Sequence, residues 1–462
     1  MFVKRPENIE EVIRHDLCNR CGSCVGLSGG RIVFGDRTGK YLPIIREPLD
    51  EATSRLVWEA CSGKGFDFPA QRVSVFGDPK GHPFIGHYEK IYIGFSKDPE
   101  IRLNAASGGI LSAVLIWLLE KKKIDGAVVL GMSENEPWLT KPFIATTKAE
   151  ILKAAQSKYI IGPVNEILPE IGRFDGTLAY VGLPGQVHSI RLLQQMNHPS
   201  VRKIRYIFGP FYGNTLHFSS VKSFLRSFGI KDHTLITKLY FRYGEWPGKM
   251  RVELSDGRVF ELPKFHANYL IPFHIMKNSL LCTDLTNEYT DISGGDAWAP
   301  VYEERGKGFS MVISRSEAGE EIIQEMIRED RLEMKPVGEQ EAVEMHSHGY
   351  DLKKRGTFIR MQYRSWLGKP NPDYGYRLKG FPLSRYLMEI VIDALFLILG
   401  TGFARWIAEK IPPQTIGRIF EKARKLWKRS THRIKREKLE DRRQNTEYRI
   451  QKTEDRRQKN NQ

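Results

Sequence analysis

Cysteine is scarce in this chain, with only five among 462 residues. They are not spread as in a disulfide framework, because three of them lie within the stretch Cys18–Cys24. The N-terminal residues Met1–Glu7 also lack the apolar core of a secretory signal. These absences argue against a disulfide-stabilised secreted protein, and we expect a cytoplasmic protein in a reducing compartment.

Familiar nucleotide-binding motifs are absent as well. The sequence contains neither G-x-G-x-x-G nor a Walker phosphate loop. A standard Rossmann site for NAD is therefore not supported.

Long uninterrupted apolar runs are also missing. The most apolar stretch, 386–407, is interrupted by Glu389, Asp393 and Arg405, whereas a membrane-spanning helix needs about 20 predominantly apolar residues. The segment fits better as an interfacial or partner-docking helix, and the alternative is a helix packed on its own domain. Together with the basic residues up to 430, it suggests a peripheral membrane contact.

Positive charge is concentrated at the C-terminus. The formal net charge is +16, and residues 421–462 hold 16 Lys and Arg against 7 Asp and Glu. This tail thus contributes +9, which leaves +7 for the other 420 residues. The folded body therefore gives little support for nucleic-acid binding. Mixed charge with few apolar residues is typical of a disordered tail or a solvated helix.

Cys18, Cys21 and Cys24 are the most informative residues, because two residues separate each from the next. Thiolates at this spacing on a tight loop can bind three irons of one [4Fe-4S] cube. Gly22 within the loop allows the backbone to come close to such a cluster. The stretch therefore predicts an iron-sulfur site.

A complete cube needs a fourth ligand from a distance, because no cysteine follows Cys24 locally. Only Cys61 and Cys282 remain. We predict Cys61, which lies in the same N-terminal segment and is followed by glycines at 63 and 65. The alternatives are a zinc site, which more often uses two separated C-x2-C pairs, and a group of buried or paired thiols without metal.

Alternating strand and helix patterns begin at residue 91. Strand-like runs occupy 91–95, 127–131, 178–181, 204–208 and 311–314. Glycine-rich turns follow several of them and lead into apolar helices. This repetition predicts an α/β fold with a mainly parallel central sheet. Ligands on such sheets bind at the carboxyl ends of the strands.

The pattern divides the chain into five regions. We expect an iron-sulfur segment at 1–75, an α/β flavin-binding core at 76–235, a small α+β region with a hairpin at 236–335, a region with an apolar helix at 336–420, and the basic tail at 421–462.

Two short stretches suggest cofactor contacts. Asn104–Gly109 opens a helix with small residues, whose free backbone N–H groups suit a phosphate or pyrophosphate. Ser157-Lys158-Tyr159 follows a helical run. Lys158 is the candidate catalytic residue, since a lysine beside an isoalloxazine can stabilise the negative charge that reduction places near N1. A surface lysine is the alternative.

An acidic and glycine-rich segment follows Cys282. Asp284, Glu288, Asp291 and Asp296 lie in it, around Gly294-Gly295. Such residues bond ribityl hydroxyls or substrate, or they form turns and caps.

Taken in order, these stretches resemble the beta subunits of coenzyme F420 hydrogenases and dehydrogenases, a family that includes 7-hydroxymethyl chlorophyll a reductase. The likeness covers roughly residues 10 to 330. The motifs that carry it are Arg102–Gly109, Gln156–Tyr159, Gly182–Gln186, Gly244–Gly248, Leu281–Asp284 and Asp291–Trp298.

The resemblance implies an FAD-binding iron-sulfur oxidoreductase. It would pass electrons between a hydride carrier, coenzyme F420 or an organic substrate, and a redox partner protein such as a hydrogenase, dehydrogenase or ferredoxin. The metal ligands that it implies are Cys18, Cys21, Cys24 and Cys61. The flavin contacts that it implies are Asn104, Ser107, Gly108, Gly109, Ser157, Lys158, Tyr159 and Asp296, with Asp291 and Gly295 as further candidates.

Three departures from the family pattern bear on this expectation. Gly185 stands at the cysteine position of a G-x-P-C-Q motif, Ser279 stands where relatives have a cysteine three residues before Cys282, and the turn with Tyr212 lacks a cysteine. We therefore predict one cluster. Cys282 is then either a buried remnant or the alternative fourth ligand. A second functional hypothesis is a non-catalytic electron-relay or docking subunit of a larger redox complex, and an oligomer is compatible with either.

Overall fold

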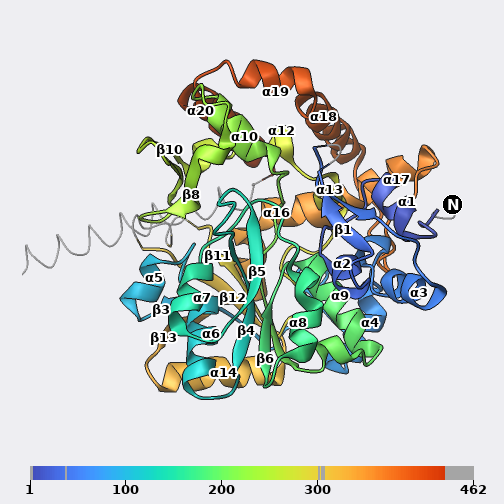
Figure 1. Cartoon of the computed structure of the whole chain (residues 1–462), viewed down its shortest axis with the longest axis vertical. Coiled ribbons are helices and arrows are strands. Elements are labelled where there is room, and N and C mark those ends of the chain that lie inside the picture. Colours follow the sequence, from blue (N-terminus) through green and yellow to red (C-terminus); the bar gives the residue numbers. More distant parts are fainter. Residues whose placement is uncertain (1–3, 37–38, 300–301, 303–306, 432–462) are drawn as a thin grey trace, which may run out of the picture.

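An eight-stranded sheet forms the centre of the molecule, in the strand order β13-β3-β12-β11-β7-β6-β4-β5 (Figure 1). The computed structural model describes residues 4–36, 39–299, 302 and 307–431. The strands are β3 (Lys90–Ser96), β4 (Gly126–Met132), β5 (Thr140–Ala145), β6 (Leu178–Val181), β7 (Ile204–Pro210), β11 (Ile292–Asp296), β12 (Ser310–Ser314) and β13 (Leu332–Pro336).

The sheet is parallel in its middle and antiparallel toward its edges. Strands β4, β6, β7 and β11 are joined by parallel pairing, whereas β5, β12 and β13 run against their neighbours. Strand β3 lies between the antiparallel β12 and β13 and so points the same way as the central four. The predicted α/β class and the predominance of one strand direction are confirmed, with antiparallel strands added.

Both faces of the sheet are covered by helices, which explains the apolar runs of its central strands. Successive residues of β4 alternate between two cores: Ala127 and Val129 join one, and Val128 joins the other. The first core is completed by α6 (Ile110–Glu120), α7 (Lys148–Ala154) and α14 (Glu317–Arg328). The second is completed by α4 (Phe68–Phe76), α8 (Leu168–Arg173) and α9 (Pro184–Gln195).

Strand β11 is an element that the sequence pattern does not predict. Its sequence, Ile292–Asp296, is short, contains two glycines and lies in a polar segment. It nevertheless pairs with β7 on one side and β12 on the other. Its hydrogen bonds to two neighbours compensate for a weak strand propensity, which no local pattern reveals.

A smaller antiparallel sheet confirms the predicted hairpin. It contains β8 (Ile236–Tyr243), β9 (Lys249–Leu254) and β10 (Val259–Pro263). Strands β9 and β10 pair across the Asp256-Gly257 turn. The short helices packed with this sheet are α10 (Ser219–Arg226), α11 (Lys264–Ala267) and α12 (Leu270–His274). Helix α5 (Pro99–Leu103) packs on β3 of the central sheet, and α13 (Lys277–Leu281) follows α12.

The N-terminal segment packs against residues far along the chain. Its elements are α1 (Ile9–Arg14), α2 (Ser23–Leu27), β1 (Ile32–Gly35), β2 (Leu42–Ile45) and α3 (Glu51–Glu59). The backbone N–H of Phe66 donates to the carbonyl of Asp373 at 2.7 Å, and that of Asn371 donates to the carbonyl of Lys4 at 2.9 Å. The region beyond residue 340 therefore belongs to the same body as the cysteine segment.

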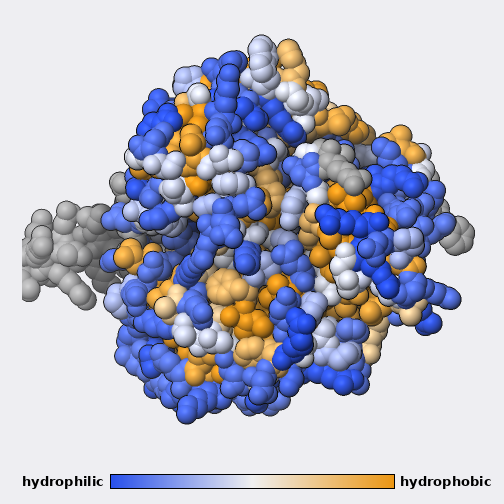
Figure 2. Space-filling model, in the orientation of Figure 1, coloured by the Kyte–Doolittle hydropathy of each residue, from blue (hydrophilic) through white to orange (hydrophobic). Residues whose placement is uncertain are grey.

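The C-terminal region is helical and carries much exposed apolar surface (Figure 2, over the upper elements of Figure 1). Its helices are α15 (Glu339–Met345), α16 (Ser347–Tyr350), a π-helical turn (Asp351–Gly356), α17 (Thr357–Trp366), α18 (Leu383–Leu399), α19 (Gly402–Ala408) and α20 (Pro413–Thr431). Among the described residues no single helix has the length and apolarity to cross a membrane, whereas α18 and α19 together do and are bent by 77°. The predicted tail beyond 431 lies outside the described residues.

Candidate functional site

The loop from Cys18 to Cys24 is held in a shape that only glycine at position 22 permits. Gly22 has φ +97°, in the left-handed region, and begins helix α2. A Cβ atom there would lie 2.5 Å from the backbone nitrogen of Glu166 and 2.7 Å from the carbonyl oxygen of Pro163. The loop is therefore pressed against the backbone that precedes α8.

All four predicted thiols line one cavity. Cys18, Cys21, Cys24 and Cys61 border it together with apolar residues of α1, β1, β2 and α3. Cys61 reaches it because α3 ends at Glu59 and the chain then turns through a short 3-10 segment. The structure thus brings the distant cysteine to the local three, as the sequence predicts.

Cys282 lies elsewhere. It is buried behind α13, with its Sγ 3.7 Å from the carbonyl oxygen of Asp284, and it is not among the described residues that line the thiol cavity. Cys61 is therefore the better placed of the two candidates for the fourth ligand.

The four thiols share a cavity without forming a site for a single ion. Within the described part of the chain, no group of three or more His, Cys, Asp and Glu side chains is arranged so as to hold a metal ion. Zinc would need four donors converging on one centre, whereas a cube attaches each thiolate to its own iron. The identity of any metal group thus stays a prediction.

Burial makes the thiols of Cys18, Cys24 and Cys61 poor acids. It raises the pKa of Cys18, that of Cys24 strongly, and that of Cys61 to about 12, and negative charge on the neighbouring thiols adds to the effect on Cys24 and Cys61. Thiolates at this place therefore require a nearby cation. That requirement fits a site for a metal group.

Hydrogen bonds fix the cysteine loop onto the end of the central sheet. Asn19 Nδ2 donates to Ser62 Oγ at 3.0 Å, and that hydroxyl donates to the carbonyl of Gly185 at 2.6 Å. Asn19 Oδ1 accepts from Asn278 Nδ2 at 2.9 Å. A Cβ at Gly185 would lie 2.8 Å from the Asn19 side chain. Gly185 therefore touches the loop between Cys18 and Cys21.

A second group of polar residues surrounds Arg242, on β8. Its guanidinium is 1% exposed and pairs with Asp296 at 2.9 Å. It also donates to the hydroxyl of Tyr159 at 3.1 Å and to the carbonyl of Ala106. Trp246 Nε1 donates to Asp296 at 2.8 Å. Arg242 thus joins three separately predicted stretches, those of Ala106, Tyr159 and Asp296.

This group, here called the Arg242 group (Ala106, Tyr159, Arg242, Trp246 and Asp296), pairs one cation with one anion and has a second cation, Lys264, beside it. Lys264 lies above the Tyr159 ring, with Nζ 5.3 Å from its centroid. Burial would raise the pKa of Tyr159, but the charges of Lys264 and Arg242 lower it. Burial would likewise raise the pKa of Asp296, and Arg242 holds it below its ordinary value. Sequence reasoning missed Arg242 because it lies two residues before the Gly244–Gly248 motif and is not part of it.

The small-residue loop lies beside this group, at the start of α6. Gly109 has φ +78° and precedes the first helical residue, Ile110. The N–H of Gly108 donates to Ser310 Oγ at 2.9 Å, and Ser107 Oγ lies 2.6 Å from the same hydroxyl. Asn104 is exposed and donates to the carbonyl of Glu100 at 2.9 Å. Among the predicted loop residues, Ser107 and Gly108 are thus hydrogen-bonded to Ser310 of β12. Asn104 lies at the surface.

Lys158 is held by its own segment. Its Nζ donates to the carbonyls of Ala154, Ala155 at 2.7 Å and Gln156 at 3.3 Å. Burial lowers its pKa to about 7. Ser157 is half-buried beside it. The lysine therefore caps the carboxyl end of α7, so that it is neither a free surface lysine nor a member of the Arg242 group.

Asp291 and Asp296 lie at opposite ends of β11. Asp291 accepts from the N–H of Ile207 at 2.7 Å and from Ser316 Oγ at 2.7 Å, next to the start of α14. A strand rises about 3.3 Å per residue, so five residues separate the two carboxylates by roughly 16 Å. The structure therefore does not bring Asp291 to the Arg242 group, and its role as a cofactor contact stays a prediction. Gly295 lies near the Asp296 end, and a Cβ there would meet the Phe211 ring at 2.5 Å.

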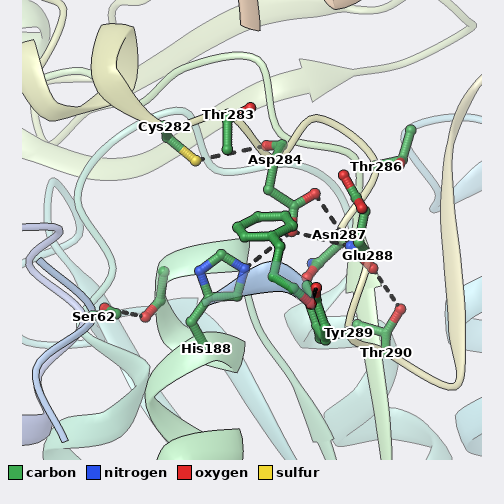
Figure 3. Close-up of polar contacts among 12 residues, drawn as sticks. Ser62, His188, Cys282, Thr283, Asp284, Thr286, Asn287, Glu288, Tyr289 and Thr290 are labelled. Carbon is green, nitrogen blue, oxygen red and sulfur yellow. Dashed lines mark hydrogen bonds and ion pairs between the residues drawn. The ribbon is translucent and has the colours of Figure 1, made fainter. Parts of the chain in front are cut away.

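The rest of the acidic segment is a buried polar loop (Figure 3). Asp284 accepts from the backbone N–H of Glu288 and lies 3.1 Å from His188 Nε2. Glu288 pairs with Lys354, which comes from the π-helical turn. Asn287 donates to the carbonyl of Gly182 at 2.7 Å, directly after β6. The loop therefore packs against the carboxyl ends of the central strands, and its side chains are buried rather than exposed in a site.

Comparisons with known proteins identify the family of this chain. The family model for the N-terminal part of the coenzyme F420 hydrogenase/dehydrogenase beta subunit matches residues 91–169, and the model for its C terminus matches residues 175–340. The chain is similar to the coenzyme F420 hydrogenase subunit beta of Methanosarcina barkeri, with 30% identity over 56% of this chain and 85% of that protein. It is also similar to a subunit of the F(420)H(2) dehydrogenase of Methanosarcina mazei, with 28% identity over 70% of this chain and 86% of that protein.

A third relative and a solved structure extend the comparison. The coenzyme F420-dependent sulfite reductase of Methanocaldococcus jannaschii is 27% identical over 68% of this chain and 46% of its own length. A chain of the F420-reducing [NiFe] hydrogenase complex from Methanosarcina barkeri shares the fold, with a TM-score of 0.51 and 24% identity over 64% of this chain and 98% of that one. The chain belongs to the family of coenzyme F420 hydrogenase/dehydrogenase beta subunits.

Proposed function

We propose that this protein is an iron-sulfur flavoprotein oxidoreductase that transfers electrons between a deazaflavin hydride carrier of the F420 type, or an organic substrate, and one-electron redox partners. The observation that carries the proposal is the convergence of Cys18, Cys21, Cys24 and Cys61 on one cavity. The family membership supports the redox chemistry. We propose a [4Fe-4S] cluster on these four thiols.

FAD is the proposed second cofactor, and it would supply the exchange between hydride and single electrons. The residues around the start of α6 suit an anionic dinucleotide. The helix has 11 residues, so its N-terminus carries unpaired N–H groups and a partial positive charge. Arg242 and Lys264 add fixed positive charge close by. Lys158 is half-buried, and a flavin anion beside it would hold it in its protonated form.

We propose one cluster per chain rather than two. The departures expected at Ser279 and in the turn with Tyr212 support it, and the hydroxyls of these two residues lie 2.7 Å apart. Lys353 donates to the carbonyl of Ser279 at 2.8 Å and lies 4.0 Å from the centroid of the Tyr212 ring. These side chains fill the space with hydrogen bonds of their own, beside the buried Cys282.

The decisive experiment is anaerobic purification of the full chain, with iron, acid-labile sulfide and flavin quantified in the same sample. We expect four irons and four sulfides per chain, as one cube requires, together with FAD. Reduced F420 should bleach the flavin absorbance. A preparation with zinc in place of iron, or with neither cofactor, would contradict the proposal.

The second candidate is a non-catalytic electron relay or docking subunit. Two of the predicted flavin contacts, Asn104 and Asp291, lie outside the Arg242 group. This incomplete set of contacts favours the second candidate. Cluster absorbance without flavin would support the relay. Either function implies a redox partner protein, and we propose a cytoplasmic location for both.

A further inference from the structure

Helix α18 turns its charged side toward the protein and its apolar side toward solvent, the reverse of an ordinary surface helix. Arg385, Glu389 and Asp393 follow one another at intervals of four residues and therefore lie on one face. Arg385 is 9% exposed and Glu389 is fully buried. The charged stripe of the helix thus faces the protein.

The inward stripe is held by ion pairs with the body of the protein. Arg385 pairs with Asp351 of the π-helical turn at 2.9 Å and with Glu389 at 2.6 Å. Arg360 of α17 pairs with Glu389 at 2.6 Å and with Asp393 at 3.5 Å. Breaking one member of such a buried network is costly. The orientation of α18 is therefore fixed, and its apolar side is directed outward.

The outward side is a continuous apolar surface. On α18 it includes Leu383, 74% exposed, and Leu397, 67% exposed, and on α19 it includes Phe403, 71% exposed. The remaining members are Leu387, Ile390, Val391, Leu395, Ile398, Trp406 and Ile407. Apolar side chains gather over these helices at the top of the molecule (Figure 2). Soluble monomers rarely expose contiguous apolar patches of this kind.

Positive charge borders this surface. The acidic residues of α18–α20 have cationic partners: Glu389 and the 37% exposed Asp393 as above, Glu409 with Arg226, and Glu421 with His266 and Lys425. Lys410 Nζ lies 6.0 Å from the centroid of the Trp406 ring, and the following helix α20 carries the exposed Arg418 and Lys422. Aliphatic side chains, exposed aromatic rings and adjacent lysines together form the composition of an interfacial membrane contact.

We propose that α18 and α19, with the basic side of α20, bind the surface of an anionic lipid bilayer, so that the protein lies in the membrane interface without leaving its own fold. The buried ion pairs keep α18 docked on the body while its outer side chains enter the acyl boundary. The lysines contact anionic headgroups. This proposal is independent of the cofactors.

The test is vesicle flotation of the full chain with phosphatidylcholine, with and without phosphatidylglycerol. We expect binding that is at least about tenfold stronger with the anionic lipid. The variant Leu387→Asp/Val391→Asp places two charges in the patch and should lose at least about tenfold in partition. Val73→Asp changes an exposed apolar residue of α4 and is the matched control, which should bind as the wild type does. Lys422→Gln should weaken binding about fivefold, and only to the anionic vesicles.

Several outcomes would overturn the proposal. They are no binding of the wild type to either vesicle, equal binding of the wild type and Leu387→Asp/Val391→Asp, and equal binding to neutral and anionic lipid. If the wild type sediments as a dimer and the double variant as a monomer, with no vesicle binding by either, the patch joins two copies. If the variant loses only a redox partner protein, the patch is a protein interface. Unchanged circular dichroism and iron content show that each variant is folded.

Discussion

The thiol cavity and the Arg242 group lie at the same edge of one sheet but are built in different ways. The cavity takes three of its four cysteines from one short loop and the fourth from the same N-terminal segment. The Arg242 group takes its residues from four stretches between Ala106 and Asp296. The first site is held by backbone shape and neutral hydrogen bonds, and the second is held by a buried ion pair.

The contrast predicts how each site fails. Loss of a thiol should remove what the cavity binds and leave the fold largely intact, because the loop is anchored by Asn19, Ser62 and Asn278. Loss of Arg242 should destabilise the fold itself, because Asp296 would remain buried without its partner. The first defect concerns a cofactor, and the second concerns the scaffold.

The largest expected effect is on cofactor content. Cys61→Ser removes the fourth thiol, and we expect iron and sulfide to fall to less than about a tenth of the wild-type content, because metal binding depends on a complete set of deprotonated ligands. Iron analysis after anaerobic purification measures this. Cys282→Ser is the matched control and should keep its iron, since Cys282 lies outside the cavity. If Cys61→Ser keeps its iron and Cys282→Ser loses it, Cys282 and not Cys61 is the fourth ligand.

The next effect is on stability. Arg242→Met should lower the free energy of unfolding by about 3–5 kcal/mol, which is typical when one member of a buried ion pair is removed. Chemical denaturation measures the change. Arg251→Met, on the neighbouring strand β9, removes an arginine whose ion pairs lie at the surface and should have little effect. The double variant Arg242→Met/Asp296→Asn should recover part of the loss, and no recovery would show that the ion pair is not the cause.

The two sites also differ in how far sequence reasoning could reach. The cysteine spacing, a local pattern with one dominant chemical meaning, predicted three of the thiols that line the cavity. The fourth, Cys61, was predicted from its place in the same N-terminal segment. The strand and helix pattern predicted β3, β4, β6, β7 and the hairpin, since these elements have strong periodicity. Strand β11 was missed because its register depends on two neighbours and not on its own residues.

The Arg242 group shows what local patterns leave out. Motifs identified Ser107, Tyr159 and Asp296 but could not show that Arg242 connects their stretches, because arginine on a strand is common and its partners are distant in sequence. Asp291 likewise lies outside the Arg242 group. A residue five positions from Asp296 is close in sequence, but in an extended strand it lies at the other end.

A smaller effect concerns pH and tests whether Lys158 belongs with the second site. Its pKa is lowered from 10.5 to about 7 in the folded protein. Between these values the unfolded chain binds more protons, so stability should rise with pH from about 7 to 10.5. Because the side chain is only half-buried, we expect about 1–2 kcal/mol over this window.

The measurement compares wild type with Lys158→Met at several pH values. The variant should lack the rise, whereas Lys203→Met, which changes an exposed lysine, should keep it. FAD bound beside Lys158 would stabilise the protonated amine and reduce the rise in the flavin-loaded protein. An identical slope with and without flavin would separate Lys158 from the flavin site.

The smallest effect probes one hydrogen bond inside the Arg242 group. Trp246→Phe removes the indole N–H that donates to Asp296 at 2.8 Å, while the ion pair from Arg242 remains. We expect a loss of about 1 kcal/mol, the typical net contribution of one hydrogen bond, because Asp296 keeps its ion pair with Arg242. Trp366→Phe, at an exposed indole of α17, is the control and should be nearly neutral. A loss in Trp246→Phe as large as that of Arg242→Met would mean that the indole, and not the ion pair, holds Asp296 in place, and the contrast between the two sites would then rest on packing instead of charge.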